Sequence, residues 1–377
     1  MKIGIITIQK SPSSYGGNLQ SFALWRYLSD LGHDVEIIDL YRPAQEGYVN
    51  STNAIKYHTY TYKPSGSRLS IKDRISSLNP KGWLARIRKN RFLLEMQQFA
   101  AQAHYSRPYF SVDDLYNNPP VYDLLISGSD QIWNKDMKFE MAPYFLDFAK
   151  VSRKISYASS FGKSTFDESY KAQIKQWLST YEKVSVRENS GVELLKSLGI
   201  DSTLVLDPTF LLRKDEWLKQ VDTRKSKRPY IMLFTLYESE RVLERVRKIA
   251  KEMNLEVFSN KQYKDFRSIA GISVNEWLGY INSSSIVITD SFHATTFSII
   301  FKKNFYSLII DNENSVKRST RLVNLLDGFG LQDHLINENQ IETIPRRSAI
   351  DYSKVDSQIE SAISHSQQFL HSVLAHG

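Results

Sequence analysis

One stretch of the chain, residues 285–301, constrains the fold more than any other. Residues 286–288 are apolar and β-branched without alternation, which is typical of a strand covered on both faces of a parallel sheet. The polar residues 289–291 offer side chains that can cap a helix beginning at about Phe292. His293 is therefore predicted at a helix start beside the carboxyl end of a strand. Ligands bind at that edge of open α/β sheets, and the first amides of a helix favour an anion.

The length and the order of the other patterns predict two domains of this kind. A chain of 377 residues is too long for one ordinary core. A strand at 2–8, a glycine-containing loop, a helix from about 19 to 31 and a strand at 35–40 predict a right-handed βαβ unit. We predict an α/β fold of two Rossmann-like domains facing a cleft. The predicted domains are 1–222, with an insertion at about 43–105, and 229–345, followed by a helix at 350–377 that can cross back to the first domain.

Composition excludes several kinds of site and partner. The chain has no cysteine, so disulfides, thiolate catalysis and cysteine-ligated metals are excluded. We expect no metal, because no His and carboxylate residues cluster with ligand spacing. The formal charge of +8 suits an anionic substrate or membrane surface, while dispersed basic residues and the lack of a recognised motif argue against nucleic acid. No apolar run reaches the roughly 18 residues of a membrane span, and a cytoplasmic protein is expected.

Further polar residues are predicted at the mouth of the first sheet. A buried strand at 122–126 leads into a turn whose carboxylate, amides and indole suit a sugar, and the alternative is a capped turn plugged by a tryptophan. The amides of Asn18 and Gln20 could bind a polyhydroxylated ligand. The predicted acceptor-binding residues are Asn18, Gln20, Asp130, Gln131, Trp133 and Asn134.

Two basic features allow more than one interpretation. Arg187 follows a strand and could bind a carboxylate or phosphate through both arms of its guanidinium, or form an ion pair with a neighbouring acid. The helical pattern at 71–103 carries Lys81, Arg86, Arg88, Lys89 and Arg91 beside apolar residues. It is interpreted either as the solvated face of a packed helix or as a peripheral contact with anionic lipid.

Five short blocks in order resemble the polysaccharide pyruvyl transferase family. They are residues 16–20, 128–134, 186–188, 207–208 and 291–293, and the resemblance extends to about residue 335. It implies the GT-B architecture of nucleotide-sugar glycosyltransferases, with phosphoenolpyruvate as co-substrate and no cofactor. The implied product is a pyruvate ketal on a surface polysaccharide intermediate, with release of phosphate. The implied acceptor is a lipid-linked glycan at the inner membrane face, and the oligomeric state is not indicated.

The resemblance also implies roles for individual residues. His293 would transfer a proton or assist phosphate departure, with Asp130 or Asp207 as base. Many members carry Arg-Leu-His-Gly where this chain has Ser291-Phe292-His293-Ala294, so an arginine of the donor site is missing. The predicted catalytic residues are His293, Arg187 and Asp130, and the predicted donor-binding residues are Arg187, Ser291, His293, Arg318 and Arg321, with Lys317 as a further substitute for the missing arginine.

Two other functions remain open at the level of sequence. A glycosyltransferase that uses a nucleotide sugar would have the same architecture. A non-catalytic glycan-binding protein would share the acceptor site and lack turnover.

Overall fold

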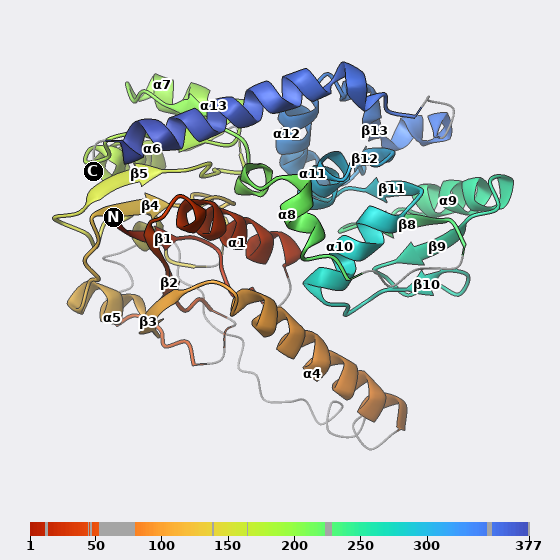
Figure 1. The fold of residues 1–377 in the computed structure, drawn as a ribbon, viewed down its shortest axis with the longest axis horizontal. Coiled ribbons are helices and arrows are strands. Elements are labelled where there is room, and N and C mark those ends of the chain that lie inside the picture. The colour runs from red at the N-terminus through yellow and green to blue at the C-terminus, as the bar shows by residue number, and fades with distance from the viewer. Residues whose placement is uncertain are drawn as a thin grey trace. The chain divides into compact units, whose positions relative to one another are not determined.

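The computed structural model describes residues 1–11, 14–43, 45, 47–52, 80–137, 139–163, 165–222, 228–344 and 349–375. The chain divides into two compact units (Figure 1). Unit 1 comprises Met1–Leu211 together with Gln368–Gly377, and unit 2 comprises Leu212–Gln367. The division falls after Leu211, whereas the sequence placed it at 222. Residues 53–79 of the predicted insertion lie outside the described residues.

Unit 1 is built on a five-stranded parallel sheet with the order β3-β2-β1-β4-β5. The central strand pairs Ile5 with Ile37 on one side and with Ile126 on the other. All three side chains are fully buried, or nearly so, as expected for a sheet covered on both faces. The strands are β1 (Lys2–Ile6), β2 (Asp34–Leu40), β3 (Tyr105–Tyr109), β4 (Leu124–Ser127) and β5 (Arg153–Ser156), with a separate short pair β6 (Ser185–Val186) and β7 (Thr203–Leu204).

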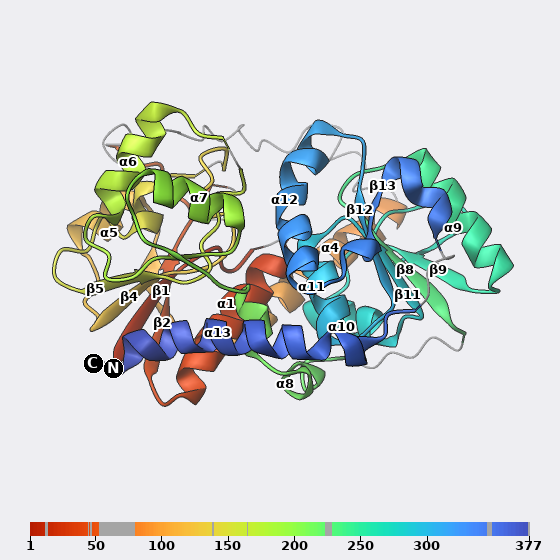
Figure 2. The ribbon, with the colours of Figure 1, turned by 90° about the horizontal axis from the view of Figure 1, so that it is seen from above.

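Helices cover both faces of this sheet. Figure 2 shows α1 and the end of α13 on one face, and α6 and α7 on the other. The helices of unit 1 are α1 (Tyr15–Asp30), α4 (Pro80–Ala100), α5 (Val112–Asn117), α6 (Glu168–Leu178), α7 (Asn189–Ser197), the 3₁₀ segments η1 (Ala142–Phe145) and η2 (Pro208–Leu211), and the end of α13 (Asp356–Leu374).

Helix α1 begins four residues earlier than the predicted position, 19. The hydroxyl of Ser14 accepts a hydrogen bond from the Gly17 amide at 3.1 Å and so caps the helix. Gly16 and Gly17 therefore lie inside the helix. A Cβ at Gly17 would lie 3.0 Å from Ile8, so the glycine allows the helix to pack closely on the loop after β1.

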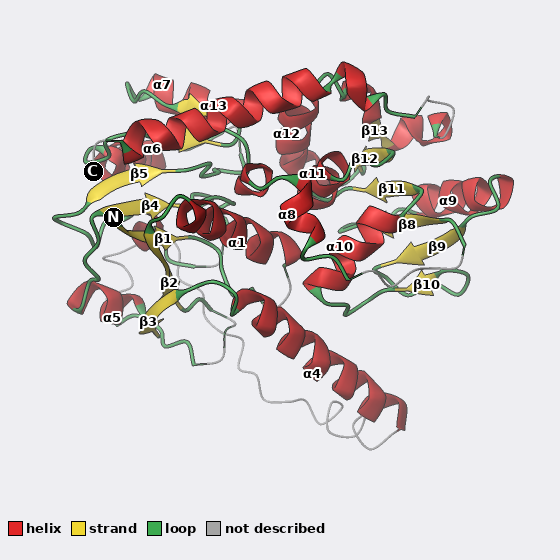
Figure 3. Ribbon diagram, in the orientation of Figure 1, coloured by secondary structure: helices red, strands yellow, loops and turns green. Residues whose placement is uncertain are grey.

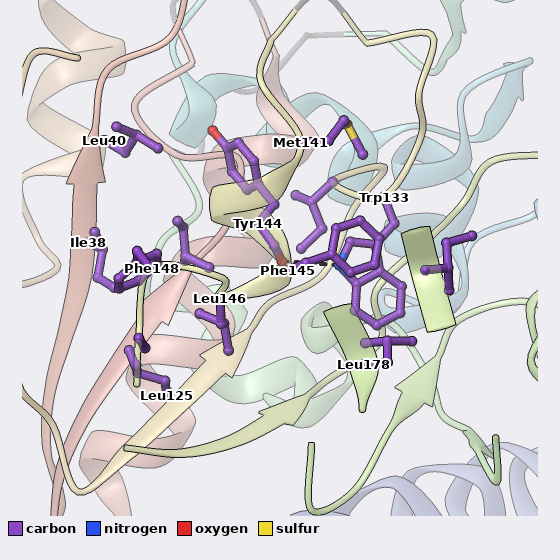
Figure 4. Close-up of a cluster of buried hydrophobic side chains, with 14 of the residues drawn as sticks. Ile38, Leu40, Leu125, Trp133, Met141, Tyr144, Phe145, Leu146, Phe148 and Leu178 are labelled. Atoms are coloured by element: carbon purple, nitrogen blue, oxygen red, sulfur yellow. Dashed lines mark hydrogen bonds between the residues drawn. The ribbon is translucent and has the colours of Figure 1, made fainter. Parts of the chain in front are cut away.

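A cluster of aromatic side chains forms the core on the α6 and α7 side of the sheet (Figure 4). Trp133 is fully buried and stacks on Phe145 at 4.8 Å between ring centroids. Its indole nitrogen donates to the Tyr144 carbonyl at 3.1 Å. The prediction that Trp133 packs against a sugar is therefore corrected, because the side chain is fully buried among Phe145, Phe161 and Tyr181.

Unit 2 has a six-stranded parallel sheet with the order β10-β9-β8-β11-β12-β13, and helices separate its strands along the chain except between β9 and β10 (Figure 3). The strands are β8 (Tyr230–Phe234), β9 (Glu256–Ser259), β10 (Arg267–Ser268), β11 (Ile286–Thr289), β12 (Phe305–Ile309) and β13 (Leu335–Asn337). The helices are α8 (Lys214–Leu218), α9 (Glu240–Glu252), α10 (Val274–Ser283), α11 (Phe292–Ile300), α12 (Glu313–Gly328), most of α13, and the 3₁₀ segments η3 (Gln332–His334), η4 (Glu338–Thr343) and η5 (Tyr352–Lys354). No helix in the described ranges is long and apolar enough to cross a membrane.

Each sheet has one point where the strand order reverses. In unit 1 this point lies between β1 and β4, and in unit 2 it lies between β8 and β11. The loops that leave two adjacent strands in opposite directions open a crevice there, so this is where ligands bind in open parallel sheets.

Candidate functional site

The reversal point of unit 2 is held together by the side chains that follow β11. Asp290 accepts hydrogen bonds from the amides of Leu236 and Tyr237, at 2.6 and 2.9 Å, in the loop after β8. The Thr289 hydroxyl donates to the Phe234 carbonyl at 2.6 Å. The two loops that leave the sheet at this point are thereby fixed to each other. The sequence suggested Asp290 only as a helix cap, whereas it binds the neighbouring loop.

His293 lies in the first turn of α11. Ser291 is the N-cap residue, in extended backbone conformation, and its side chain accepts from the Ala294 amide at 3.4 Å. The imidazole of His293 is partly exposed and contacts the Phe292 ring edge-on, with centroids 5.3 Å apart. The structure therefore brings Ser291 and His293 together at the positively polarised end of a helix.

A small pocket lies beside this helix start. Its volume is about 20 Å³, which is room for roughly one water molecule. The Arg321 guanidinium lies 5.5 Å from the centre of the Phe292 ring in its wall. Burial raises the pKa of Asp290, and the two amides it accepts from oppose that shift. The lining residues are Leu236, Tyr237, Asp290, Phe292, Leu308, Ser315, Ser319, Arg321 and Leu322.

Two hydroxyls of this wall were not predicted. Ser315 and Ser319 are four residues apart on α12, so they share one face of that helix, and Arg321 also lines the pocket. This four-residue spacing was the signal in the sequence that could have identified the two serines. Of the cations proposed to replace the family arginine, only Arg321 is placed in the wall, because the side chains of Lys317 and Arg318 lie outside the described residues.

In unit 1, Arg187 joins two carboxylates at the ends of different strands. One arm of its guanidinium lies 2.5 Å from Asp207 and the other 3.4 Å from Asp130. Only 2% of the Arg187 side chain is exposed, and none of the Asp207 side chain. Burial disfavours the charge, but Asp207, Asp130 and Glu188 outweigh it and raise the pKa of Arg187. The predicted contact between Arg187 and the donor is corrected, because its guanidinium is held in a buried ion pair.

The two carboxylates in this group differ in their surroundings. Asp207 also accepts from the Ser129 hydroxyl at 3.2 Å and from the amide and hydroxyl of Thr209, which makes it a structural anchor. Asp130 is 14% exposed and has a φ of 71°, a left-handed conformation that costs energy outside glycine. Such strained residues cluster at functional sites, so Asp130 is the carboxylate of this group that fits a reacting role.

The other predicted acceptor residues are occupied by contacts inside unit 1. Asn18 bonds to the backbone of Ser11 through both its oxygen and its nitrogen, at 2.8 and 3.0 Å. The Gln20 amide donates to the Ile8 and Gly17 carbonyls and to Thr7. Gln131 and Asn134 are buried and bond to each other at 3.2 Å. All four hold the loops after β1 and β4, and their binding of an acceptor stays a prediction.

The basic helix predicted after the insertion is α4. Phe99 packs on Phe22 at 5.3 Å and anchors the end of the helix on α1. Ile87 and Leu94 are about half exposed, and Arg91 pairs with Glu95 one turn away. The side chains of residues 80–86 lie outside the described part, so the membrane contact stays a prediction.

Comparison with known proteins adds a family and a fold. Residues 15–312 match the family described as polysaccharide pyruvyl transferase. No curated protein sequence matches the chain. Its structure is similar to UDP-GlcNAc 2-epimerase from Methanocaldococcus jannaschii, with 11% identity, a TM-score of 0.53 and 100% of both chains covered. It is also similar to UDP-GlcNAc 2-epimerase from Neisseria meningitidis bound to UDP-GlcNAc, with 11% identity, a TM-score of 0.51 and 100% of both chains covered. These likenesses confirm the predicted α/β class with two Rossmann-like units of the GT-B kind.

Proposed function

We propose a reaction for this chain on the premise that it belongs to the polysaccharide pyruvyl transferase family. In this proposal it moves the enolpyruvyl group of phosphoenolpyruvate to a pair of hydroxyls on a surface polysaccharide intermediate. The product is a pyruvate ketal, and phosphate is released. The protein needs no cofactor, and the acceptor is a lipid-linked glycan at the inner membrane face.

The observation that carries the donor assignment is the pocket beside α11. Phosphoenolpyruvate bears a carboxylate and a phosphate, so its site must offer cations and fixed hydrogen-bond donors. The pocket wall supplies the Arg321 guanidinium and the hydroxyls of Ser315 and Ser319, next to the helix start at Ser291. A volume of about 20 Å³ takes one oxygen of the anion, and in this proposal the rest of the donor lies outside the pocket.

In this proposal the reaction uses the residue roles that the sequence predicts. An acceptor hydroxyl loses its proton to a general base, the role predicted for Asp130, and its oxygen forms a bond to C2, while the double-bond electrons take a proton at C3 from a general acid, the role predicted for His293. The second hydroxyl then attacks C2, the bond from C2 to the phosphate oxygen breaks, and phosphate leaves with that electron pair and the hydroxyl proton. Asp130 releases its proton and His293 regains one, so both return to their starting state. Arg187 acts as a positioning residue that holds Asp130.

Thermal unfolding with phosphoenolpyruvate, phosphate or uridine diphosphate tests the donor. Phosphoenolpyruvate at 100 times its Kd should stabilise the protein by about 2.7 kcal/mol, and Arg321→Gln should abolish this. Arg247→Gln is the matched control, since Arg247 is a surface arginine of the same unit paired with Asp265 at 2.7 Å. His293→Gln should lower phosphate release at least about 100-fold. Stabilisation by uridine diphosphate alone would replace this proposal with a nucleotide-sugar glycosyltransferase.

A further inference from the structure

A second group of buried polar side chains lies in unit 1, at the carboxyl ends of β1 and β2. Gln9 and Arg42 follow these two strands, and Tyr144 and Glu140 come from the segment at η1. Each of the four residues is at least 91% buried, with exposures of 1%, 9%, 1% and 5%. Neither the charge pattern nor any periodicity in the sequence singled them out.

Gln9 and Arg42 are each anchored at one end only. The Gln9 amide nitrogen donates to Asp39 at 3.2 Å and to the Leu40 carbonyl at 3.3 Å. One arm of Arg42 donates to the Gln9 carbonyl at 2.6 Å. Within the described residues, the Gln9 side-chain oxygen and the other terminal nitrogen of Arg42 make no hydrogen bond, although both are buried. The bonded atoms of each side chain hold it in place and so fix the direction in which its unbonded atom points.

Tyr144 likewise has one polar group that is bonded within unit 1 and another that is not. Its carbonyl accepts from Ser127 and Trp133, while its ring is directed away from the Trp133 stack (Figure 4). Its hydroxyl is buried, and the hydrogen-bonding neighbour that it faces in the described ranges is the Arg42 guanidinium. Burial raises the pKa of Tyr144, nearby Arg42 opposes this, and Glu140 adds to it, so the hydroxyl interacts with both charges.

Glu140 has the fewest polar partners of the four residues. Its carboxylate has neither a hydrogen bond nor an ion pair among the residues that the structure describes. Burial and then Asp113 raise the pKa of Glu140 to about 7. The other groups that face it are the hydroxyls of Tyr48 and Tyr144. A buried polar group without a partner costs roughly 1–3 kcal/mol, so retaining several in one place indicates a use for them.

The charges and shapes in this group identify the kind of ligand. The cations Lys10 and Arg42 are balanced by Asp39, which lies 2.5 Å from Lys10, and by ionised Glu140. A balanced group does not attract an anion. Two donors, Arg42 and Tyr144, and two acceptors, Gln9 and Glu140, match the alternating donor and acceptor roles of sugar hydroxyls. The rings of Tyr48 and Tyr105 lie nearby and can pack on sugar C–H groups.

We propose that Gln9, Arg42, Tyr144 and Glu140 form a binding site for a neutral hexopyranose, which is the acceptor sugar if the proposed function holds. Ionised Glu140 accepts a hydrogen bond from one sugar hydroxyl, Gln9 accepts from another, and Arg42 and Tyr144 donate to sugar oxygens. Protonation of Glu140 removes one acceptor, so affinity falls as the pH falls below about 7.

Binding of methyl glucosides, galactosides and mannosides, measured by saturation-transfer NMR and titration calorimetry, tests this site. We expect at least one of them to bind the wild type at pH 8 and more weakly at pH 6. Tyr144→Phe and Glu140→Gln should each weaken binding about tenfold or more. In Glu140→Gln the difference between pH 8 and pH 6 should disappear.

Tyr170→Phe is the matched control, because the Tyr170 hydroxyl is also buried in unit 1 but donates to the Trp133 carbonyl at 2.6 Å. Tyr170→Phe should lower stability and leave glycoside binding unchanged. Tyr144→Phe should weaken glycoside binding and should not lower stability. A loss of stability in Tyr144→Phe with unchanged binding would make the group purely structural. If phosphoenolpyruvate stabilises the wild type and no glycoside binds, this site is overturned and the reaction stands. If glycosides bind and phosphoenolpyruvate does not, the site stands and the reaction is overturned.

Discussion

At the scale of single residues, burial separates polar side chains that a ligand can reach from those that support the fold. Arg187 and Asp130 come from conspicuous polar turns, yet the first is enclosed and the second is partly exposed with a left-handed backbone. Burial converts Arg187 from a predicted ligand-binding residue into a support for its neighbour. From the same buried ion pair we predict that the loss of one partner lowers the free energy of unfolding.

Asp207→Asn should lower the free energy of unfolding by about 3–5 kcal/mol, because it leaves the buried Arg187 charge without its principal partner. Urea unfolding at pH 7 measures this loss. Glu182→Gln is the control, since it breaks the partly exposed pair with Arg153 and should cost less than about 1 kcal/mol. Equal effects of the two substitutions would contradict the assigned burial.

Glu140→Gln should raise stability at pH 8 and leave it unchanged near pH 4.5. Folding raises the pKa of Glu140 from 4.5 to about 7, so the folded protein holds a proton that the unfolded chain releases. Wild-type stability is therefore lost as the pH rises from about 4.5 to about 7, by at most about 3 kcal/mol. Urea unfolding at both pH values checks this.

Glu36→Gln is the companion control for Glu140, because Glu36 accepts from the Tyr122 hydroxyl at 2.8 Å. It should give no gain at pH 8. A Glu140→Gln variant that is no more stable than the wild type at pH 8 would show that the carboxylate is well solvated.

At the scale of elements, the strand, turn and helix at 285–301 were predictable because three local signals agree there. Apolar β-branched residues form β11, Ser291 caps α11, and His293 occupies its first turn. The beginning of α1 was not predictable from its glycines, which indicate a loop unless the cap at Ser14 is recognised. The group around Glu140 was not predictable at all, because its burial depends on contacts between β1, β2 and η1 that no local pattern encodes.

Ser291→Ala should cost about 1 kcal/mol of stability through loss of the α11 cap, and it should also weaken stabilisation by phosphoenolpyruvate. Ser273→Ala is matched to it, because Ser273 caps α10 by accepting from the Glu276 amide at 3.0 Å, away from the pocket wall. Thermal unfolding with and without phosphoenolpyruvate compares them. Similar stability losses with a ligand effect only in Ser291→Ala support the pocket, and a ligand effect in both would contradict it.

At the scale of the whole molecule, helix α13 belongs to both units. Its last residues complete unit 1: Leu370 is fully buried, Lys183 donates to Ser372 at 2.7 Å, and Arg153 donates to the Val373 carbonyl at 3.1 Å. The earlier part of the same helix belongs to unit 2, where Lys302 pairs with Asp356 at 2.6 Å.

Leu370→Ala should lower the free energy of unfolding by about 2–5 kcal/mol, because it leaves a cavity in the core of unit 1. Chemical unfolding measures the loss, with Glu360→Ala on the exposed side of the same helix as control. Phosphoenolpyruvate should still stabilise Leu370→Ala, since the proposed donor pocket lies in unit 2. A change below about 0.5 kcal/mol would show that this end of α13 is not docked.

The shared helix also sets an order of events during synthesis. The ribosome makes residues 1–211 first, yet the segment that completes their fold, Gln368–Gly377, emerges only after all of unit 2. Domains that are continuous in sequence can finish folding as they emerge. Here unit 1 cannot complete its fold until unit 2 has been translated. During that time the surface of unit 1 that the end of α13 later covers stays exposed.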